Sequence, residues 1–183
     1  MQNSYACGQL VYLRAPTSAD VAGNWYQWFS DPEITQYLAD RYWPNSVEAQ
    51  AAFYESTKNS RDRLVLSVCV IGTDEHIGVC SLSSINWVHR YADIAFVVGE
   101  KAHRKGPIAV EVMSLLLSVA FNRLNLLNLR SVHMASNPHT PLLEKMFGFR
   151  EVGRYQQFYF DRGTYVDAVY TQLSRAVWVE RNK

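Results

Sequence analysis

The stretch VVGEKAHRKGPIAVEVMSLLLSVAF, residues 97–121, carries the strongest structural signal in this chain. A β-branched run ends at Gly99, a basic turn follows, and a long apolar helix is predicted to begin near Pro107. The turn contains Lys101, His103, Arg104, Lys105 and Gly106. Backbone N–H groups and positive side chains at a helix N-terminus favour an anion, most naturally a phosphate. An ordinary strand–turn–helix connection with solvated charges would show the same residues.

The chain has 183 residues and a formal net charge of +1. This length suits one domain, residues 1–183, and no linker-like segment divides it. Lys and Arg are scattered, which argues against nucleic-acid binding through a general basic surface. No apolar run approaches the roughly 20 residues needed to span a bilayer, and the first residues do not resemble a signal peptide. We therefore expect a cytoplasmic protein with neither nucleic acid nor membrane as a partner.

The three cysteines and five histidines show no metal-binding spacing, so no metal site is expected. Cys69 and Cys80 lie in two runs that look like the strands of a hairpin. With a turn centred on residues 73–76, the two thiols would face each other. In a reducing compartment we interpret them as small buried apolar residues.

Hydrophobic periodicity and turn residues predict the order of the other elements. Strands are expected at 10–15, 64–71, 77–85, 91–99, 129–135, 150–160 and 165–174, and helices at 17–29, 46–59, from 107 onward and at 141–147. Ser46 is the expected N-cap of the second helix, and Gly148 suits a C-terminal cap. Hairpins combined with one strand–helix–strand crossover indicate the α/β (α+β) class, with a mixed, mostly antiparallel sheet and helices on its faces.

Taken together, these segments resemble the GNAT superfamily of N-acetyltransferases, in particular the branch with ribosomal-protein N-terminal and amino-sugar acetyltransferases. The resemblance rests on segments from most of the chain: Leu13-Arg14-Ala15, DPEITQYL (31–38), Ile77-Gly78, ADIAFVVG (92–99), the basic turn, Asn137, Gly148-Phe149 and GTYVD (163–167). It implies a GNAT fold with about seven strands, splayed at the cofactor strands. It also implies transfer of an acetyl group from acetyl-CoA to a primary amine.

The pyrophosphate turn of that family has the pattern Arg/Gln-x-x-Gly-x-Gly/Ala. On this chain the pattern places Arg104 first, Pro107 at the first glycine and Ala109 at the last position. Proline removes one backbone donor, and four residues keep theirs: Lys105, Gly106, Ile108 and Ala109. A register shifted by one residue would keep Gly106 as the glycine and lose Arg104 as the leading residue.

The resemblance also implies that the backbone of Phe96, Val97 and Val98 pairs with the pantetheine arm of the coenzyme like an added strand. Asn137 would contact the same arm. As an alternative, Asn137 is a turn-forming residue before Pro138.

For catalysis, the resemblance makes Asp93 the first candidate for a base, acting directly or through water. Relatives usually carry a tyrosine as proton donor where this chain has Glu144. Other candidates for the acid are His133, Tyr155, Tyr159 and Tyr165, and direct attack that needs no dedicated acid is a further alternative. The backbone N–H groups of Val97 and Val98 would stabilise the oxyanion.

The first two helices and their loop are expected to bind the acceptor. The candidate residues there are aromatic or basic: Trp25, Trp28, Tyr37, Arg41, Tyr42 and Trp43. Flat rings with one charge suit a small amine or a nucleotide-linked amino sugar, and they equally suit a peptide N-terminus, as in protein N-terminal acetyltransferases. A GNAT-like protein that binds coenzyme A without catalysis is the third hypothesis. The C-terminal segment 176–183, with Val177, Trp178 and Val179 exposed, suggests a homodimer contact.

Overall fold

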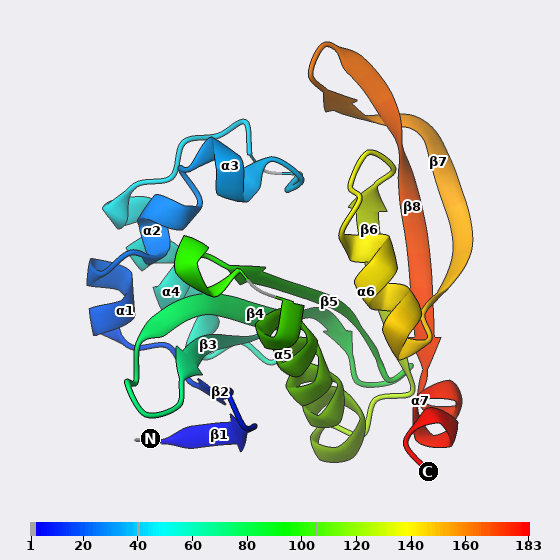
Figure 1. Cartoon of the computed structure of the whole chain (residues 1–183), viewed down its shortest axis with the longest axis horizontal. Helices are drawn as coiled ribbons and strands as arrows, with labels where there is room; N and C mark the ends of the chain where they lie inside the picture. The colour runs from blue at the N-terminus through cyan, green and yellow to red at the C-terminus, as the bar shows by residue number, and fades with distance from the viewer. Residues whose placement is uncertain (1–2, 40, 105) are drawn as a thin grey trace.

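The computed structural model describes residues 3–39, 41–104 and 106–183, and Lys105, predicted to bind the cofactor, lies outside them. Eight strands form one sheet in the order β1-β2-β3-β4-β5-β6-β8-β7 (Figure 1). The strands are β1 (Ser4–Cys7), β2 (Val11–Arg14), β3 (Leu64–Val70), β4 (His76–Asn86), β5 (Tyr91–Val98), β6 (Asn128–Met134), β7 (Arg150–Asp161) and β8 (Thr164–Ser174). Neighbouring strands are antiparallel except β5 and β6. The expected mixed sheet is confirmed, with β1 added to the seven predicted strands.

The helices are α1 (Ser18–Ala22), α2 (Trp25–Trp28), α3 (Pro32–Thr35), α4 (Val47–Thr57), α5 (Gly106–Ser118), α6 (Thr140–Phe147) and α7 (Arg175–Arg181). Capping side chains start α1, α3, α4 and α7. The helix predicted over residues 17–29 is interrupted at Gly23, which caps the C-terminus of α1. Ser46 accepts a hydrogen bond from the backbone N–H of Ala49 and caps α4 as predicted. Gly148 adopts the left-handed conformation after α6, also as predicted.

Helices pack on both faces of the sheet, as expected for this class of fold. On one face, Val112 and Leu116 of α5 join a core cluster that includes Ile94 of β5. On the other face, Trp25 and Trp28 of α2 pack with residues of β3 and β4. Because side chains alternate along a strand, β5 contributes to both layers. Figure 1 shows α5 crossing one face of the strands, with the β7–β8 hairpin extending past β6.

The sheet is splayed between β5 and β6. These parallel strands pair at Tyr91–Asn128, Ala92–Leu129 and Asp93–Arg130, and no further pairs between them are found in the described chain. Beyond Asp93, β5 is paired with β4 along its other side. Beyond Arg130, β6 is paired with β8. The edge of β5 from residue 94 to 98 is therefore open, which confirms the predicted splay.

Two local expectations were wrong. The register of β3 and β4 pairs Cys80 with Leu66 and Cys69 with His76, so the two thiols do not face each other. The C-terminal segment is a helix, α7, in which Val177 and Trp178 pack against the main core cluster. A short helix can place these side chains on its inner face, which an unstructured tail cannot, so the exposed patch expected there is reduced mainly to Val179.

The helical segment Gly106–Arg123, α5 with the π-helical turn Val119–Arg123 that follows it, is long and apolar enough to cross a membrane by length and composition. The expectation that no segment approaches this length was wrong. Its buried side chains, however, belong to the main core cluster, including Val112, Leu117 and Phe121. The segment is therefore the core helix that supports β5.

A carboxylate on α5 holds the turn between β1 and β2. Glu111 accepts hydrogen bonds from the backbone N–H groups of Gln9 (2.6 Å), Leu10 (2.7 Å) and Val11 (2.8 Å). We expect Glu111→Gln to lower the free energy of unfolding by about 2–3 kcal/mol, because an amide removes the charge and turns a donor toward these N–H groups. Urea denaturation measures the difference, with the exposed Glu55→Gln as the control. A loss no larger than that of the control would contradict the expectation.

Candidate active site

The open edge of β5 leads directly into the first turn of α5. Phe96, Val97 and Val98 are half-buried; Phe96 packs against the main core cluster and Val97 against the smaller one. The backbone of Val97 faces β4, so the groups that alternate with it, those of Phe96 and Val98, face the splay. At the end of the strand, a Cβ on Gly99 would lie 2.0 Å from the indole of Trp28. Glycine is required at this position because the ring occupies the space of a side chain. The indole of Trp28 thus packs directly against the end of β5, and its Nε1–H donates to Glu100 (3.0 Å).

The basic turn is held by neighbouring carboxylates and by the strand end. Lys101 pairs with Glu33 (2.7 Å), and His103 Nε2 lies 3.1 Å from Glu75. The Nε–H of Arg104 donates to the carbonyl of Val98 (3.0 Å). At the start of α5, the space beside Gly106 is open. The predicted anion site therefore consists mainly of backbone N–H groups in the first turn of α5, next to the open edge.

Asn137 lies buried where the chain passes from β6 into α6. Its Oδ1 accepts from the backbone N–H groups of His139 (2.9 Å) and Thr140 (3.3 Å), and its Nδ2 donates to Thr140 Oγ1 (2.9 Å). These are the contacts of a turn-forming asparagine that starts a helix. The contact with the coenzyme arm stays a prediction.

A cavity of about 480 Å³ lies on the α1–α4 face of the sheet and reaches β5 at Ala95, Phe96 and Val97. Apolar side chains make most of its wall, including Trp25, Phe29, Leu38, Trp43, Phe53 and Val79. Polar groups in the wall are Thr35, Asn45, Gln50, Ser81 and the guanidinium of Arg41. No Asp, Glu or His lines the cavity within the described ranges.

Three residues predicted at the acceptor site line this cavity: Trp25, Arg41 and Trp43. Gln50 and Phe53 also line it and were not predicted. Gln50 and Phe53 are three residues apart on α4, so they lie on one face of the helix. This spacing was the available signal.

Arg41, in the loop after α3, contacts β6 and β7, which lie across the splay from β5. Its guanidinium donates to Asp161 Oδ1 (3.0 Å), to the carbonyl of Phe160 (3.1 Å) and to Met134 Sδ (3.2 Å). Asp161 also accepts from Ser136 Oγ (2.7 Å). These contacts connect the loop that carries Arg41 with the tip of the β7–β8 hairpin and with the end of β6. Because the guanidinium of Arg41 is already paired with Asp161, we expect it to stabilise this part of the cavity wall and not to pair with a ligand.

The other predicted acceptor residues have different surroundings. Tyr42 is half exposed, and its hydroxyl contacts both Arg41 and the carbonyl of Phe160. Tyr37 lies near His139, with ring centroids 6.2 Å apart. Trp28 is buried in the smaller core cluster and is not among the residues that line the acceptor cavity.

Asp93 lies at the last pair before the splay and makes a bidentate ion pair with Arg130 (2.8 and 3.0 Å). The carboxylate is exposed to solvent and does not line the acceptor cavity. Asp93 and Ala95 share a face of β5 and are about 6.6 Å apart along the strand. If Asp93 acts as the base, it would therefore reach the acceptor amine through a water molecule and not directly.

The candidates for a proton donor occupy other parts of the sheet. His133 Nδ1 and Glu144 Oε2 lie 3.6 Å apart, buried beneath α6. Arg41 contacts Met134, the next residue of β6, so His133 faces the side of the sheet opposite the acceptor cavity. Tyr155 is on β7, three strands from β5, a separation of about 14 Å at the usual strand spacing. The structure brings His133 and Glu144 together but does not bring either of them to Asp93.

Residues 11–150 match the GNAT acetyltransferase domain, and the chain therefore belongs to the GNAT acetyltransferase family. It is an N-acetyltransferase of this type. Over 146 residues it is 27% identical to the uncharacterized N-acetyltransferase p20 of Bacillus licheniformis, covering 77% of this chain and 80% of that protein.

Two solved structures illustrate the shared fold. The spermidine N-acetyltransferase from Vibrio cholerae, in complex with CoA and spermine, superposes with a TM-score of 0.85 at 20% identity, covering 94% of this chain and 99% of the other. A GNAT-family acetyltransferase from Bacillus anthracis gives a TM-score of 0.77 at 16% identity, covering 92% and 97%. At these identities, the likeness is one of fold.

Proposed function

We propose that this protein transfers the acetyl group of acetyl-CoA to the primary amine of a small molecule. The observation that carries the proposal is the position of the open edge of β5. That edge starts beside the first turn of α5 and borders the acceptor cavity at residues 95–97. One strand can therefore orient the coenzyme arm and present its thioester to the cavity.

The residues around the edge fit the coenzyme. Backbone groups of Phe96 and Val98 would pair with the pantetheine arm, because an open strand edge offers unpaired N–H and C=O groups. Those of Val97, between them, face β4. The N–H groups of Gly106, Ile108 and Ala109 would hold the pyrophosphate at the N-terminus of α5. Arg104, whose Nε–H donates to the carbonyl of Val98, would add a positive charge beside the pyrophosphate if it gave up this hydrogen bond.

Acetyl-CoA supplies a thioester: a C–N bond forms to the acceptor, the C–S bond breaks, and the proton lost by the amine ends on the CoA sulfur. Of the two predicted donors, the N–H group of Val98 faces the open edge and would stabilise the negative charge on the carbonyl oxygen, whereas that of Val97 faces β4. Asp93 would accept the proton of the amine through water. Solvent would return a proton to the thiolate, because the predicted donors Glu144, His133 and Tyr155 lie away from the open edge of β5.

The cavity favours an amine that enters uncharged. Its described wall contains no carboxylate or imidazole that would hold an ammonium group. Deprotonating an α-amine with a pKa near 8 at pH 7 costs about 1.4 kcal/mol, whereas a lysine-like amine costs nearly 5 kcal/mol. We therefore propose an acceptor whose amine has a low pKa.

The same wall favours a single amine on a flat or apolar body. Trp25, Trp43 and Phe53 offer rings, while Gln50, whose Oε1 accepts from Asn45 (3.0 Å), offers a neutral amide N–H. A polyamine would bring further ammonium groups that this wall leaves unpaired, at a large desolvation cost. A small primary amine with an aromatic body, or a nucleotide-linked amino sugar, therefore suits the cavity better than spermidine. A protein N-terminus is the alternative acceptor.

The test measures coenzyme affinity by calorimetry, with desulfo-CoA and ATP as comparisons, and then thiol release with a panel of amines. The panel contains phenylalaninamide, an amino sugar, spermidine and a peptide with a free N-terminus. We expect CoA-selective binding and transfer to phenylalaninamide or the amino sugar above spermidine. Absence of CoA binding up to millimolar concentration contradicts the enzyme assignment, and binding without transfer supports the non-catalytic alternative. Preference for the peptide supports N-terminal acetylation.

Phe53→Ala is expected to lower kcat/KM for the preferred monoamine about tenfold, equivalent to about 1.4 kcal/mol of lost apolar contact. The affinity for CoA should not change, because Phe53 lies on α4, in the wall of the acceptor cavity. Phe158→Ala, which removes an exposed ring from β7, is the matched control. Equal kinetics for the parent and Phe53→Ala would show that the acceptor binds elsewhere.

A further inference from the structure

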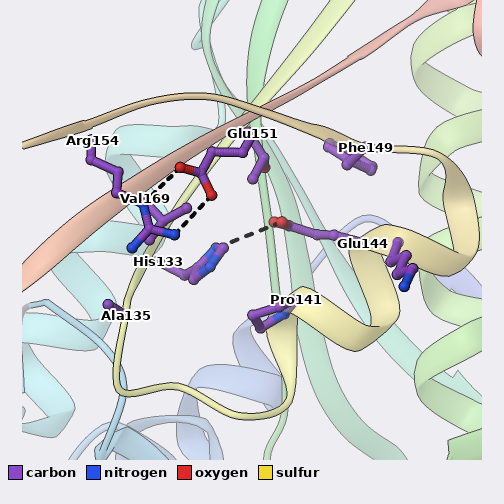
Figure 2. A pocket seen from close by; sticks show the side chains of 10 residues that line it. His133, Ala135, Pro141, Glu144, Phe149, Glu151, Arg154 and Val169 are labelled. Atoms are coloured by element: carbon purple, nitrogen blue, oxygen red, sulfur yellow. Dashed lines mark hydrogen bonds and ion pairs between the residues drawn. The ribbon is translucent and has the colours of Figure 1, made fainter.

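A second cavity, of about 290 Å³, lies between α6 and the strands β6, β7 and β8 (Figure 2). Phe149 and Val169 form part of its apolar wall, and Glu151 and Arg154 stand at its rim. His133, one of the residues that line it, faces away from the acceptor cavity. The two cavities are therefore on opposite faces of the sheet and share no lining residue.

Three buried polar side chains line this cavity: His133, Glu144 and Thr171. Each is less than a tenth exposed. His133 Nδ1, both carboxylate oxygens of Glu144 and Thr171 Oγ1 have no hydrogen-bond partner among the described residues. Among the described residues, one further buried side-chain atom has no hydrogen-bond partner, His76 Nε2, and His76 does not line this cavity. Buried polar atoms without partners are costly, so their convergence on one cavity indicates a bound group.

The charges around the cavity indicate whether an anion or a cation would bind there. The Glu144 carboxylate on the floor lies 3.6 Å from His133 Nδ1, too far for a normal hydrogen bond. Arg154 at the rim is occupied by Glu151 through two hydrogen bonds (2.6 and 2.9 Å) and lies 3.9 Å from Asp167. Lys145 also lines the cavity, but its side chain is exposed to solvent, whereas Glu144 is buried. An anion would be repelled by Glu144, whereas a cation with N–H donors would be attracted.

We propose that the cavity under α6 binds a primary ammonium group with a short apolar body. An ammonium has three N–H donors. One donates to the Glu144 carboxylate, one to Thr171 Oγ1 and one to Nδ1 of a neutral His133. The body lies against Phe149 and Val169. This site is separate from acetyl transfer, so the amine bound here is a ligand and not the acceptor.

The test uses the whole chain without acetyl-CoA and n-propylammonium chloride as the probe. Binding is followed by NMR of the histidine ring signals and by thermal shift. Tetramethylammonium chloride at equal concentration is the control, because it has the same charge and no N–H donor. We expect a saturable change at His133 with propylammonium, no such change at the exposed His89, and no saturation with tetramethylammonium. No saturable change, or the same change with both salts, overturns the proposal and leaves water as the occupant.

Two variants test the contacts. Glu144→Gln keeps the shape of the side chain and is expected to weaken propylammonium binding at least tenfold. Thr171→Val removes one acceptor with little change in volume and is expected to weaken binding about threefold, which keeps the test valid if the first variant does not fold. Glu55→Gln, an exposed carboxylate far from the cavity in the sequence, should bind as the parent does. Parent-like affinity in a folded Glu144→Gln or in Thr171→Val overturns the proposal.

Discussion

Replacing Asp20 with asparagine is expected to lower the free energy of unfolding by about 3–5 kcal/mol, because the change breaks a buried ion pair and leaves one charge without its partner. The partner is Arg14, whose guanidinium donates to both oxygens of Asp20 (2.6 and 2.7 Å). The same carboxylate accepts from the backbone N–H of Thr17 (2.7 Å) and from Ser67 Oγ (3.0 Å), and lies 3.3 Å from His76 Nδ1. Asp20 therefore connects α1 to β2, β3 and β4.

The pH dependence of stability gives an independent measure of the same network. Burial by itself raises the pKa of Asp20, but the hydrogen bonds from Arg14 and the nearby positive charges outweigh it and lower the pKa to about 2. A carboxyl whose pKa is depressed in the folded state stabilises the protein above its unfolded pKa, near 4. This contribution, about 2 kcal/mol, is lost as the pH falls from 4 toward 2.

Urea denaturation at pH 7 and at intervals down to pH 2.5 measures both effects. The parent should lose stability steeply below pH 4, and Asp20→Asn should lose less over the same interval. The control is Asp62→Asn, which changes an exposed carboxylate. Similar stabilities for Asp20→Asn and this control would show that the network contributes little.

Pro107→Ala is expected to tighten coenzyme A binding by about 10- to 100-fold. Proline lacks a backbone N–H in the first turn of α5, where such groups would face the pyrophosphate. One hydrogen bond to a charged group contributes about 1.5–3 kcal/mol, and each 1.4 kcal/mol corresponds to a factor of ten in affinity. Alanine restores the donor and keeps a side chain at the position, so the comparison isolates the N–H group.

Calorimetric titration of CoA into both proteins provides the measurement. Pro141→Ala is the matched control, because it removes the proline from the first turn of another helix, α6. An unchanged dissociation constant for Pro107→Ala would mean that residue 107 does not face the phosphates. That result would favour the register in which Gly106 is the glycine of the turn.

Much of the fold was predictable because the signals are local. The Ser46 cap of α4, the left-handed Gly148 after α6 and the turn at residues 161–164 each depend on residues within one turn of chain. The strand–turn–helix stretch at residues 97–121 was predicted for the same reason. Local signals did not reveal β1, because its four residues carry little periodicity.

The candidate site was predictable in part. The cofactor strand and the first turn of α5 are adjacent in the sequence, so the family pattern located them together. The cavity proposed for the acceptor is also lined by Gln50 and Phe53, whose helix, α4, lies far from β5 in the sequence. The register of β3 and β4 likewise depends on pairing along whole strands, which is why the facing thiols were predicted wrongly.

The sequence by itself determined the class of fold, the order of the elements and the family, because hydrophobic periodicity and capping residues act over a few residues. Tertiary structure alone decided which side chains meet. Arg41 reaches Asp161 across 120 positions of the chain, and His133 meets Glu144 under α6 because β6 and α6 pack face to face. Such contacts depend on the packing of whole elements, and no local pattern encodes them.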